Sequence, residues 1–77
     1  MKPKSYVTFS VLEEKQKTKV YAVQSRSDGD ILGEIKWYFG WRQYVFFPAD
    51  DTIWSRGCLQ EIVSFIQKLM DERNKKP

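Results

Sequence analysis

The side chains with the clearest chemical potential in this sequence are aromatic and basic, and they concentrate between Leu32 and Phe47. Flat aromatic rings offer stacking surfaces for nucleobases, lysine and arginine attract phosphate, and a glutamine amide can hydrogen-bond a base edge. The residues that combine these chemistries predict a surface that binds nucleic acid. They are Lys19, Tyr21, Lys36, Tyr38, Trp41, Arg42 and Gln43.

Catalytic chemistry has much weaker support. The sequence contains no histidine, so the commonest general base and the commonest metal ligand are missing. Cys58 is the single cysteine, and one thiolate cannot form a cysteine-only zinc site. The neighbouring carboxylates Asp50 and Asp51 are typical of a solvated loop. We therefore predict a protein that is not an enzyme and that uses no metal and no cofactor.

Length and composition predict one small domain over residues 1–77. The chain is 42% hydrophobic and 16% aromatic, and so short a chain needs aromatic burial to offset the entropy of folding. No apolar run reaches membrane-spanning length, and the lone cysteine suits a reducing compartment, so we expect a cytoplasmic protein with no membrane partner. The net charge is +3, and basic residues near both ends suggest either solvated tails or attraction to phosphate: Lys2, Lys4, Arg73, Lys75 and Lys76.

The binding side chains need a scaffold, and alternating apolar residues predict four strands. Alternation begins at Ser5 and continues to Leu12, and strand-like segments follow over 17–25, 31–38 and 41–47. Turn sequences separate them, and the strongest is Asp28-Gly29. Phe39-Gly40 is a weaker turn signal, which also fits a type II turn or a four-residue loop. Pro48 should end the fourth strand because it has no amide hydrogen to donate.

A single helix is predicted from Ser55, whose hydroxyl is the expected N-cap. Apolar residues at intervals of three and four form its stripe, which consists of Leu59, Ile62, Val63, Ile66, Leu69 and Met70. We expect Trp54 to be structural and to pack against Leu59 across the first turn. The helix should end near Arg73, and residues 1–4 and 74–77 are predicted to be flexible tails.

Short turns determine which residues share a face of the sheet. Two-residue loops at the two predicted turns, with a first turn near Glu14-Lys15, give the pairs Val7–Ala22, Ala22–Ile35 and Ile35–Tyr44. One face then holds the residues that the helix should cover: Val7, Phe9, Val11, Val20, Ala22, Ile35, Trp37, Tyr44 and Phe46. The predicted fold is α+β, a four-stranded antiparallel meander (β-β-β-β-α) with one C-terminal helix packed on one sheet face.

Two details of the helix-covered face follow from this register. Gly33 is expected to let the helix backbone approach the sheet closely, because glycine has no side chain in the way. Arg42 falls beside Trp37, where its guanidinium group would cover the indole ring.

The opposite face would carry six of the candidate nucleic-acid-binding residues in two rows: Lys19 beside Tyr38 and Trp41, then Tyr21 beside Lys36 and Gln43. The same pattern also fits rings that only cover the sheet, with lysines that keep it soluble. An apolar patch farther along this face predicts a different function, a protein interface for a homodimer or a host partner; its residues are Val23, Leu32, Val45 and Phe47. Nucleic-acid binding and protein binding therefore both stand as hypotheses.

A sequence pattern adds a resemblance to these inferences. The run LGxIKWYxxWRQYxFFP begins at Leu32 and is followed by TxWxxxCLxEI, which ends at Ile62; the resemblance that they carry covers Leu32 to about Ile66. It resembles a group of short uncharacterised bacterial and phage proteins, which usually have a Gly-Pro-like turn where this chain has Phe39-Gly40. The resemblance implies one compact unit and a viral or mobile-element setting. It implies no substrate.

Overall fold

Residues 6–74 are described by a computed structural model and form an antiparallel sheet followed by a helix. The strands are β1 (Val7–Glu14), β2 (Lys19–Ser25), β3 (Ile31–Tyr38) and β4 (Gln43–Pro48), and the helix is α1 (Arg56–Asn74). The strands lie in the sheet in chain order. The predicted α+β meander with a C-terminal helix is therefore confirmed. The predicted tails lie outside the described residues, except for Asn74, which ends α1.

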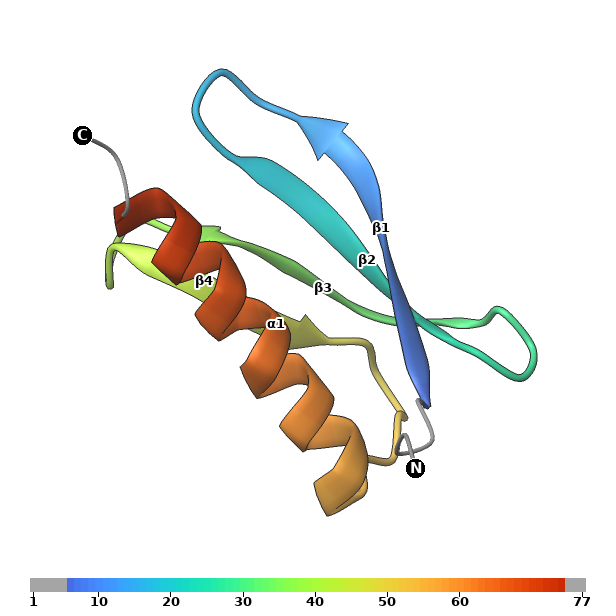
Figure 1. Cartoon of the computed structure of the whole chain (residues 1–77). Coiled ribbons are helices and arrows are strands. Elements are labelled where there is room, and N and C mark those ends of the chain that lie inside the picture. The colour runs from blue at the N-terminus through green and yellow to red at the C-terminus, as the bar shows by residue number, and fades with distance from the viewer. Residues whose placement is uncertain (1–5, 75–77) are drawn as a thin grey trace.

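The helix covers one face of the sheet near β4. In Figure 1, α1 runs alongside β4, and the β1–β2 hairpin extends away from the helix. We call the other face of the sheet the open face, since within residues 6–74 no helix lies over it. In the same part of the chain, no helix combines the length and the apolar character needed to cross a membrane.

The three hairpins all close through four-residue loops, 15–18, 26–29 and 39–42. In the second loop the Gly29 amide donates to the Ser25 carbonyl at 2.8 Å, and in the third the Arg42 amide donates to the Tyr38 carbonyl at 2.9 Å. The backbone then becomes left-handed at the last loop residue, where φ is 79° at Gly29 and 54° at Arg42, and this turns the chain back into the next strand instead of continuing a helical turn. The two-residue loop predicted at Asp28-Gly29 is wrong, and at Phe39-Gly40 the four-residue alternative is the one that forms.

Two bulges lie on either side of β2. Leu12 is an extra residue in β1, and Leu32 is an extra residue in β3, at the points where the pairing with β2 shifts. A shift of one residue exchanges the two faces of a strand relative to its neighbour. Because there is one bulge on each side of β2, β1 and β3 keep the same faces relative to each other. Only β2 therefore turns a different face toward the helix from the predicted one.

β2 accordingly turns Tyr21 and Val23 toward α1. Tyr21 pairs with Ile35, and Val23 is completely buried. Val20 and Ala22, which were predicted to face the helix, alternate onto the open face and are buried there with 7% and 1% of their surface exposed. The predicted pairing of Ala22 with Ile35 is thus wrong, and so is that of Val7 with Ala22, because Val7 pairs with Ser25.

The β3–β4 register differs from the predicted one by two residues. Ile35 pairs with Phe46, and Trp37 pairs with Tyr44. A two-residue shift leaves both strand faces unchanged. Ile35 and Tyr44 are therefore buried under α1 as expected, with 0% and 6% exposure.

The core forms where the sheet meets the middle of α1. Its buried residues are Val7, Val23, Ile35, Tyr44, Ile62 and Leu69. Phe9 extends it by stacking on Phe65 of the helix, with ring centroids 4.0 Å apart. The predicted stripe is only partly correct, because Leu59 and Val63 remain 43% and 61% exposed. The helix therefore presents a narrower apolar face to the sheet than its sequence suggests.

The start of α1 is held by its cap and by an aromatic contact. The Cys58 amide donates to the Ser55 hydroxyl at 3.2 Å, which confirms the predicted N-cap. The Trp54 ring meets Phe46 edge-on with centroids 4.9 Å apart, and its Nε1 donates to the Thr52 hydroxyl at 2.8 Å. Trp54 is thus structural as predicted, through β4 and the preceding loop.

Gly33 and Trp37 each have a neighbour other than the predicted one. A Cβ atom at Gly33 would lie 2.7 Å from the Phe46 ring and 2.7 Å from the Phe47 carbonyl oxygen, so it is β4 that approaches there. The guanidinium carbon of Arg73, at the end of α1, lies 4.1 Å from the centre of the Trp37 ring. Arg73 therefore takes the place that the predicted register assigned to Arg42.

Candidate nucleic-acid interface

The open face carries a group of contacting aromatic rings and a lysine near the β3–β4 loop. We define the open-face strip as Lys36, Tyr38, Trp41 and Phe47. The Tyr38 ring meets Trp41 edge-on with centroids 5.1 Å apart, and it meets Phe47 at 6.5 Å. Lys36 Nζ lies 4.8 Å from the centre of the Phe47 ring. These contacts join β3, the loop and β4 into one surface.

The rings of the strip remain accessible to solvent. Trp41 is 65% exposed, Tyr38 is 42% exposed and Phe47 is 37% exposed. A fully buried ring could not stack on a ligand, and a fully exposed ring would have no fixed orientation. Each of these rings contacts a neighbour and still exposes part of its surface, so area remains on which a base could stack.

Gly40 helps to orient the Tyr38 ring. A Cβ atom at Gly40 would lie 2.9 Å from Cε2 and 3.0 Å from Cζ of that ring. The Tyr38 ring thus lies directly against the loop backbone, and the Trp41 ring is nearly perpendicular to it. A side chain at position 40 would move the ring, so the loop sequence contributes to the shape of the strip.

Charged and polar groups flank the rings. Gln43 pairs with Tyr38 in the sheet, and both Gln43 and Arg42 are exposed. Lys36 Nζ lies 3.9 Å from Glu34, and each side chain retains 43% of its surface. An ion pair this long and this exposed contributes little energy, so it leaves the lysine able to attract phosphate. The strip therefore combines aromatic surface with positive charge.

The structure brings together five of the seven predicted residues, namely Lys36, Tyr38, Trp41, Arg42 and Gln43. Tyr21 was predicted to join them and lies on the helix side, where its ring meets Phe65 with centroids 5.1 Å apart. Burial is the main cause that raises the pKa of Tyr21 above its usual value, and the Tyr44 phenol and the carboxylates of Glu72 and Glu14 raise it further. Its predicted place on the open face is wrong because of the bulges beside β2.

Lys19 is also separated from the strip. Its position at the start of β2 pairs it with Glu14, and its backbone amide donates to the Tyr44 hydroxyl at 3.4 Å. Together with Tyr21 and Glu72 it lines a cavity beside the end of α1. Lys19 therefore does not lie beside Tyr38, as the predicted register required.

Phe47 is the strip residue that sequence reasoning left out. The predicted register placed it on the open face, but farther along β4, within the apolar patch. The actual register moves β4 by two residues along β3, and this brings Phe47 within reach of Tyr38 and Lys36. The sequence predicted that Phe47 lies on the open face, but its neighbours there depend on the length of the β3–β4 loop.

The predicted apolar patch is not a single surface. Val23 belongs to the buried core, and Leu32 occupies the bulge in β3 and packs against that core. Val45 and Phe47 remain on the open face. The prediction that Val23 belongs to an exposed apolar patch is therefore wrong.

The residues considered for catalysis lie away from the strip. Cys58 is a half-buried free thiol in the first turn of α1. Asp50 and Asp51 are exposed in the loop before the helix, and Asp51 has a left-handed backbone with φ of 60°. None of these three residues belongs to the candidate interface.

Comparison with known proteins yields a relative from a phage. The chain is 37% identical over 57 residues to a protein named "Uncharacterized 9.3 kDa protein" from Acholeplasma phage L2, and the match covers 71% of this chain and 73% of the relative. No family model and no solved structure matches the chain. The similarity agrees with the phage setting that the sequence pattern implied.

Proposed function

The chain belongs to the same family as the uncharacterised 9.3 kDa protein of Acholeplasma phage L2, and we propose that it is a small, non-enzymatic module that binds single-stranded nucleic acid. The binding surface is the open-face strip, flanked by Arg42 and Gln43. The observation that carries the proposal is the exposure of three contacting rings beside a lysine, on the sheet face that α1 leaves open.

The rings favour a single strand over a duplex. Attraction between basic side chains and phosphate does not favour a single strand, because a duplex carries the higher density of backbone charge. Unpaired bases, however, present their flat faces, and each base stacked on an aromatic side chain contributes about 1–3 kcal/mol. Trp41 offers the largest open ring of the strip, so it is the best platform for the first base.

The supporting contacts give the strip a defined shape before any ligand binds. Tyr38 is held by contacts with the loop backbone at Gly40 and with the rings of Trp41 and Phe47. Ordering a flexible side chain on binding costs about 0.5–1.5 kcal/mol, so rings that are already oriented bind with less loss of entropy. Gln43 lies at the same end of the sheet, where its amide can reach a base edge.

Fluorescence anisotropy with labelled hexathymidylate, its RNA equivalent and duplexes of both kinds tests the proposal at low salt. We expect both single strands to bind more tightly than the duplexes. Trp41→Ala should weaken strand binding by roughly 5- to 150-fold, the equivalent of one lost stacking contact. The absence of strand binding by the wild-type chain at low salt would contradict the proposal.

Two variants serve as matched controls. Ile53→Ala removes another large exposed side chain, 96% exposed in the loop before α1, and should leave strand binding unchanged. Lys68→Ala removes an exposed positive charge from α1, whereas Lys36→Ala removes one from the strip. If Lys68→Ala weakened binding as much as Lys36→Ala, the attraction would be general and the strip would not be the site.

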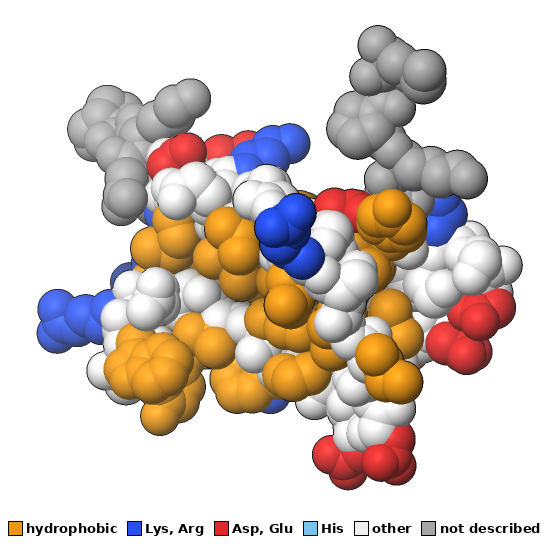
Figure 2. Space-filling model, turned by 90° about the horizontal axis from the view of Figure 1, so that it is seen from below, with side chains coloured by type: hydrophobic (Ala, Val, Ile, Leu, Met, Phe, Trp, Pro, Cys, Tyr) orange, Lys and Arg blue, Asp and Glu red, His pale blue; other side chains and the backbone are white. Residues whose placement is uncertain are grey.

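A protein interface is the second candidate, because exposed apolar side chains are not confined to the strip. Val63 and Leu59 on α1 and Ile31 on β3 are 61%, 43% and 54% exposed. In the view of Figure 2, hydrophobic side chains gather across the middle of the molecule, and most charged ones lie toward its margins. Light scattering that finds a monomer, together with strand binding, would count against this alternative.

A further inference from the structure

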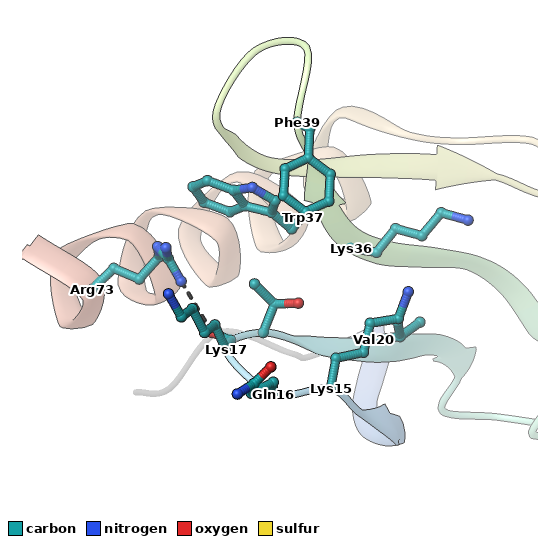
Figure 3. Close-up of a pocket in the computed structure, with 9 residues that line it drawn as sticks. Lys15, Gln16, Lys17, Val20, Lys36, Trp37, Phe39 and Arg73 are labelled. Carbon is teal, nitrogen blue, oxygen red and sulfur yellow. Dashed lines mark hydrogen bonds between the residues drawn. The ribbon is translucent and has the colours of Figure 1, made fainter.

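A second aromatic and basic feature lies at the end of the sheet. A cavity of about 290 Å³ opens between the β1–β2 loop, the end of β3 and the last turn of α1, and we call it the end cavity. Its charged and aromatic lining consists of Lys15, Lys17, Lys36, Trp37, Phe39 and Arg73. Figure 3 shows that Arg73 enters from α1 and the two loop lysines from β1–β2, with both rings on the opposite side.

The end cavity is positively charged and has little compensation. Its four basic residues come from three elements, and no carboxylate lines it. Among the described residues, Lys15, Lys17 and Arg73 make no ion pair, and Lys36 has only the long contact of 3.9 Å to Glu34. Like charges that converge without a counter-ion repel one another, so binding of an anion there is favoured.

Arg73 is held in place at the end cavity before any ligand arrives. Its Nη1 donates to the Lys17 carbonyl at 3.2 Å, and its guanidinium carbon lies 4.1 Å from the centre of the Trp37 ring. A guanidinium group has five N–H donors, and the Lys17 contact occupies one of them. The remaining donors can bind the oxygens of a phosphate group, for which the planar fork of arginine is well suited.

Phe39 supplies an unused aromatic surface at the rim of the end cavity. Its side chain is 83% exposed, and within residues 6–74 no other ring stacks on it or meets it edge-on. Phe39 is the first residue of the same loop that carries Trp41. A strand whose bases stack on Trp41 and Tyr38 can therefore continue over this loop toward the end cavity, and Lys36 belongs to both surfaces.

A second cavity next to the end cavity differs from it in the charge of its lining. It opens on the helix side, between the same β1–β2 loop and the end of α1, and it shares Lys15, Lys17 and Arg73 with the end cavity. Glu14 and Glu72 line it as well. Two carboxylates disfavour an anion there, whereas the end cavity has none.

We propose that the end cavity holds one nucleotide of the bound strand, with its phosphate among Lys15, Lys17 and Arg73 and its base against Phe39. The inference rests on the proposed function and extends it, because it assigns a second contact point to the strand. It also gives a role to three basic residues that the open-face strip does not include.

Two titrations of the full chain test this assignment. In the first, thymidine monophosphate is added to isotope-labelled protein, and thymidine without phosphate serves as the matched ligand. We expect the phosphorylated nucleotide to shift the amide resonances of 15–18 and 37–39 and the Trp37 indole resonance, and thymidine to shift them far less. The double variant Lys15→Ala/Lys17→Ala should lose these shifts, although the Lys17 carbonyl that Arg73 uses remains.

In the second titration, hexathymidylate affinity is measured over a range of salt concentrations. Each phosphate contact of a single strand contributes about 0.7 to the slope of log affinity against log salt. The double variant should therefore reduce that slope by about 1.4 if both lysines contact phosphate. Lys68→Ala, with its lysine on the outer side of α1, should leave the slope unchanged, and Phe39→Ala should weaken binding without altering the slope.

The outcomes separate this inference from the proposed function. If hexathymidylate binds but the double variant keeps the wild-type slope, the end-cavity assignment is overturned and the strip remains the site. If thymidine monophosphate shifts the resonances of lysines throughout the chain equally, the assignment is likewise overturned. If no strand binds while thymidine monophosphate still shifts the end-cavity resonances, the proposed function fails and the nucleotide site stands.

Discussion

A left-handed backbone at a residue other than glycine costs about 1–2 kcal/mol, and Arg42 adopts it at the end of the β3–β4 loop. The equivalent position of the preceding hairpin is occupied by Gly29, for which the conformation carries no such cost. Strained residues often mark binding sites, because a side chain needed for function is retained where glycine would be more stable. Arg42 borders the open-face strip, which fits this pattern.

The two substitutions Arg42→Gly and Arg42→Ala separate strain from charge. Both remove the guanidinium group, but only glycine relieves the left-handed strain. We expect Arg42→Gly to be more stable than Arg42→Ala by about 1 kcal/mol in urea denaturation. Both variants should weaken hexathymidylate binding to a similar extent. Equal stability of the two variants would show that the loop relaxes to another conformation.

Tyr21 predicts a pH dependence of stability. Its pKa in the folded chain is raised above 10.0, mainly by burial, so the folded state retains the phenol proton at a pH where the unfolded chain has lost it. The contribution of Tyr21 to the free energy of unfolding is therefore complete below pH 10 and is lost as pH rises from 10 through the folded-state pKa.

Urea denaturation of the wild-type chain and of Tyr21→Phe between about pH 8 and about pH 11 measures this effect. The phenylalanine ring keeps the contacts with Phe65 and removes the ionisable group. We expect the difference in stability between the two proteins to be constant below pH 10 and to shift in favour of Tyr21→Phe above it. A difference that stays constant over the whole range would show that Tyr21 is as solvated as in the unfolded chain.

At the scale of elements, loop length and bulges decide what the open face contains. The loops determine which residues of β3 and β4 are neighbours, and this places Phe47 beside Tyr38. The bulges at Leu12 and Leu32 reverse β2, and this moves Tyr21 to the helix. The strip therefore belongs to β3, β4 and their loop, and β2 supplies small buried residues beneath the side chains of the open face.

The beginning of α1 depends on the contact between Trp54 and Phe46 of β4. Trp54→Ala should lower the free energy of unfolding by about 3 kcal/mol, at the lower end for a buried aromatic because the ring is only half-buried. Trp54→Phe retains a ring against Phe46 and loses the hydrogen bond to Thr52, which should cost about 1 kcal/mol.

The matched control for this prediction is Trp41→Ala, which removes the same side chain from an exposed position. Its midpoint of urea denaturation should remain close to that of the wild-type chain. A similar loss of stability in Trp41→Ala and Trp54→Ala would mean that both rings support the fold and would contradict the division between core and strip.

At the scale of the whole molecule, the arrangement of charge matters more than its sum. The net charge is only +3, yet the end cavity alone is lined by four basic residues and no carboxylate. The open-face strip begins at Lys36, which also lines the end cavity, so the aromatic surface and the positive surface are continuous. In the proposed complex, this continuous surface would let a module of modest overall charge contact several nucleotides.

The sequence by itself determined the four strands, the capped helix and the fold class, because alternation, helical periodicity and capping are local signals. It also placed Lys36 and Tyr38 on the open face, since the β3–β4 register differs from the predicted one by two residues and strand faces repeat every two. Trp41 was predicted in the fourth strand and lies in the β3–β4 loop, where it contacts Tyr38. Only the tertiary structure decided the faces of β2, the inclusion of Phe47 and the approach of Arg73 to Trp37. These depend on the exact length of the hairpin loops, on two bulges and on the packing of the helix end. The turn sequences left the loop lengths open, and the approach of Arg73 to Trp37 is a contact between segments that are distant in the chain.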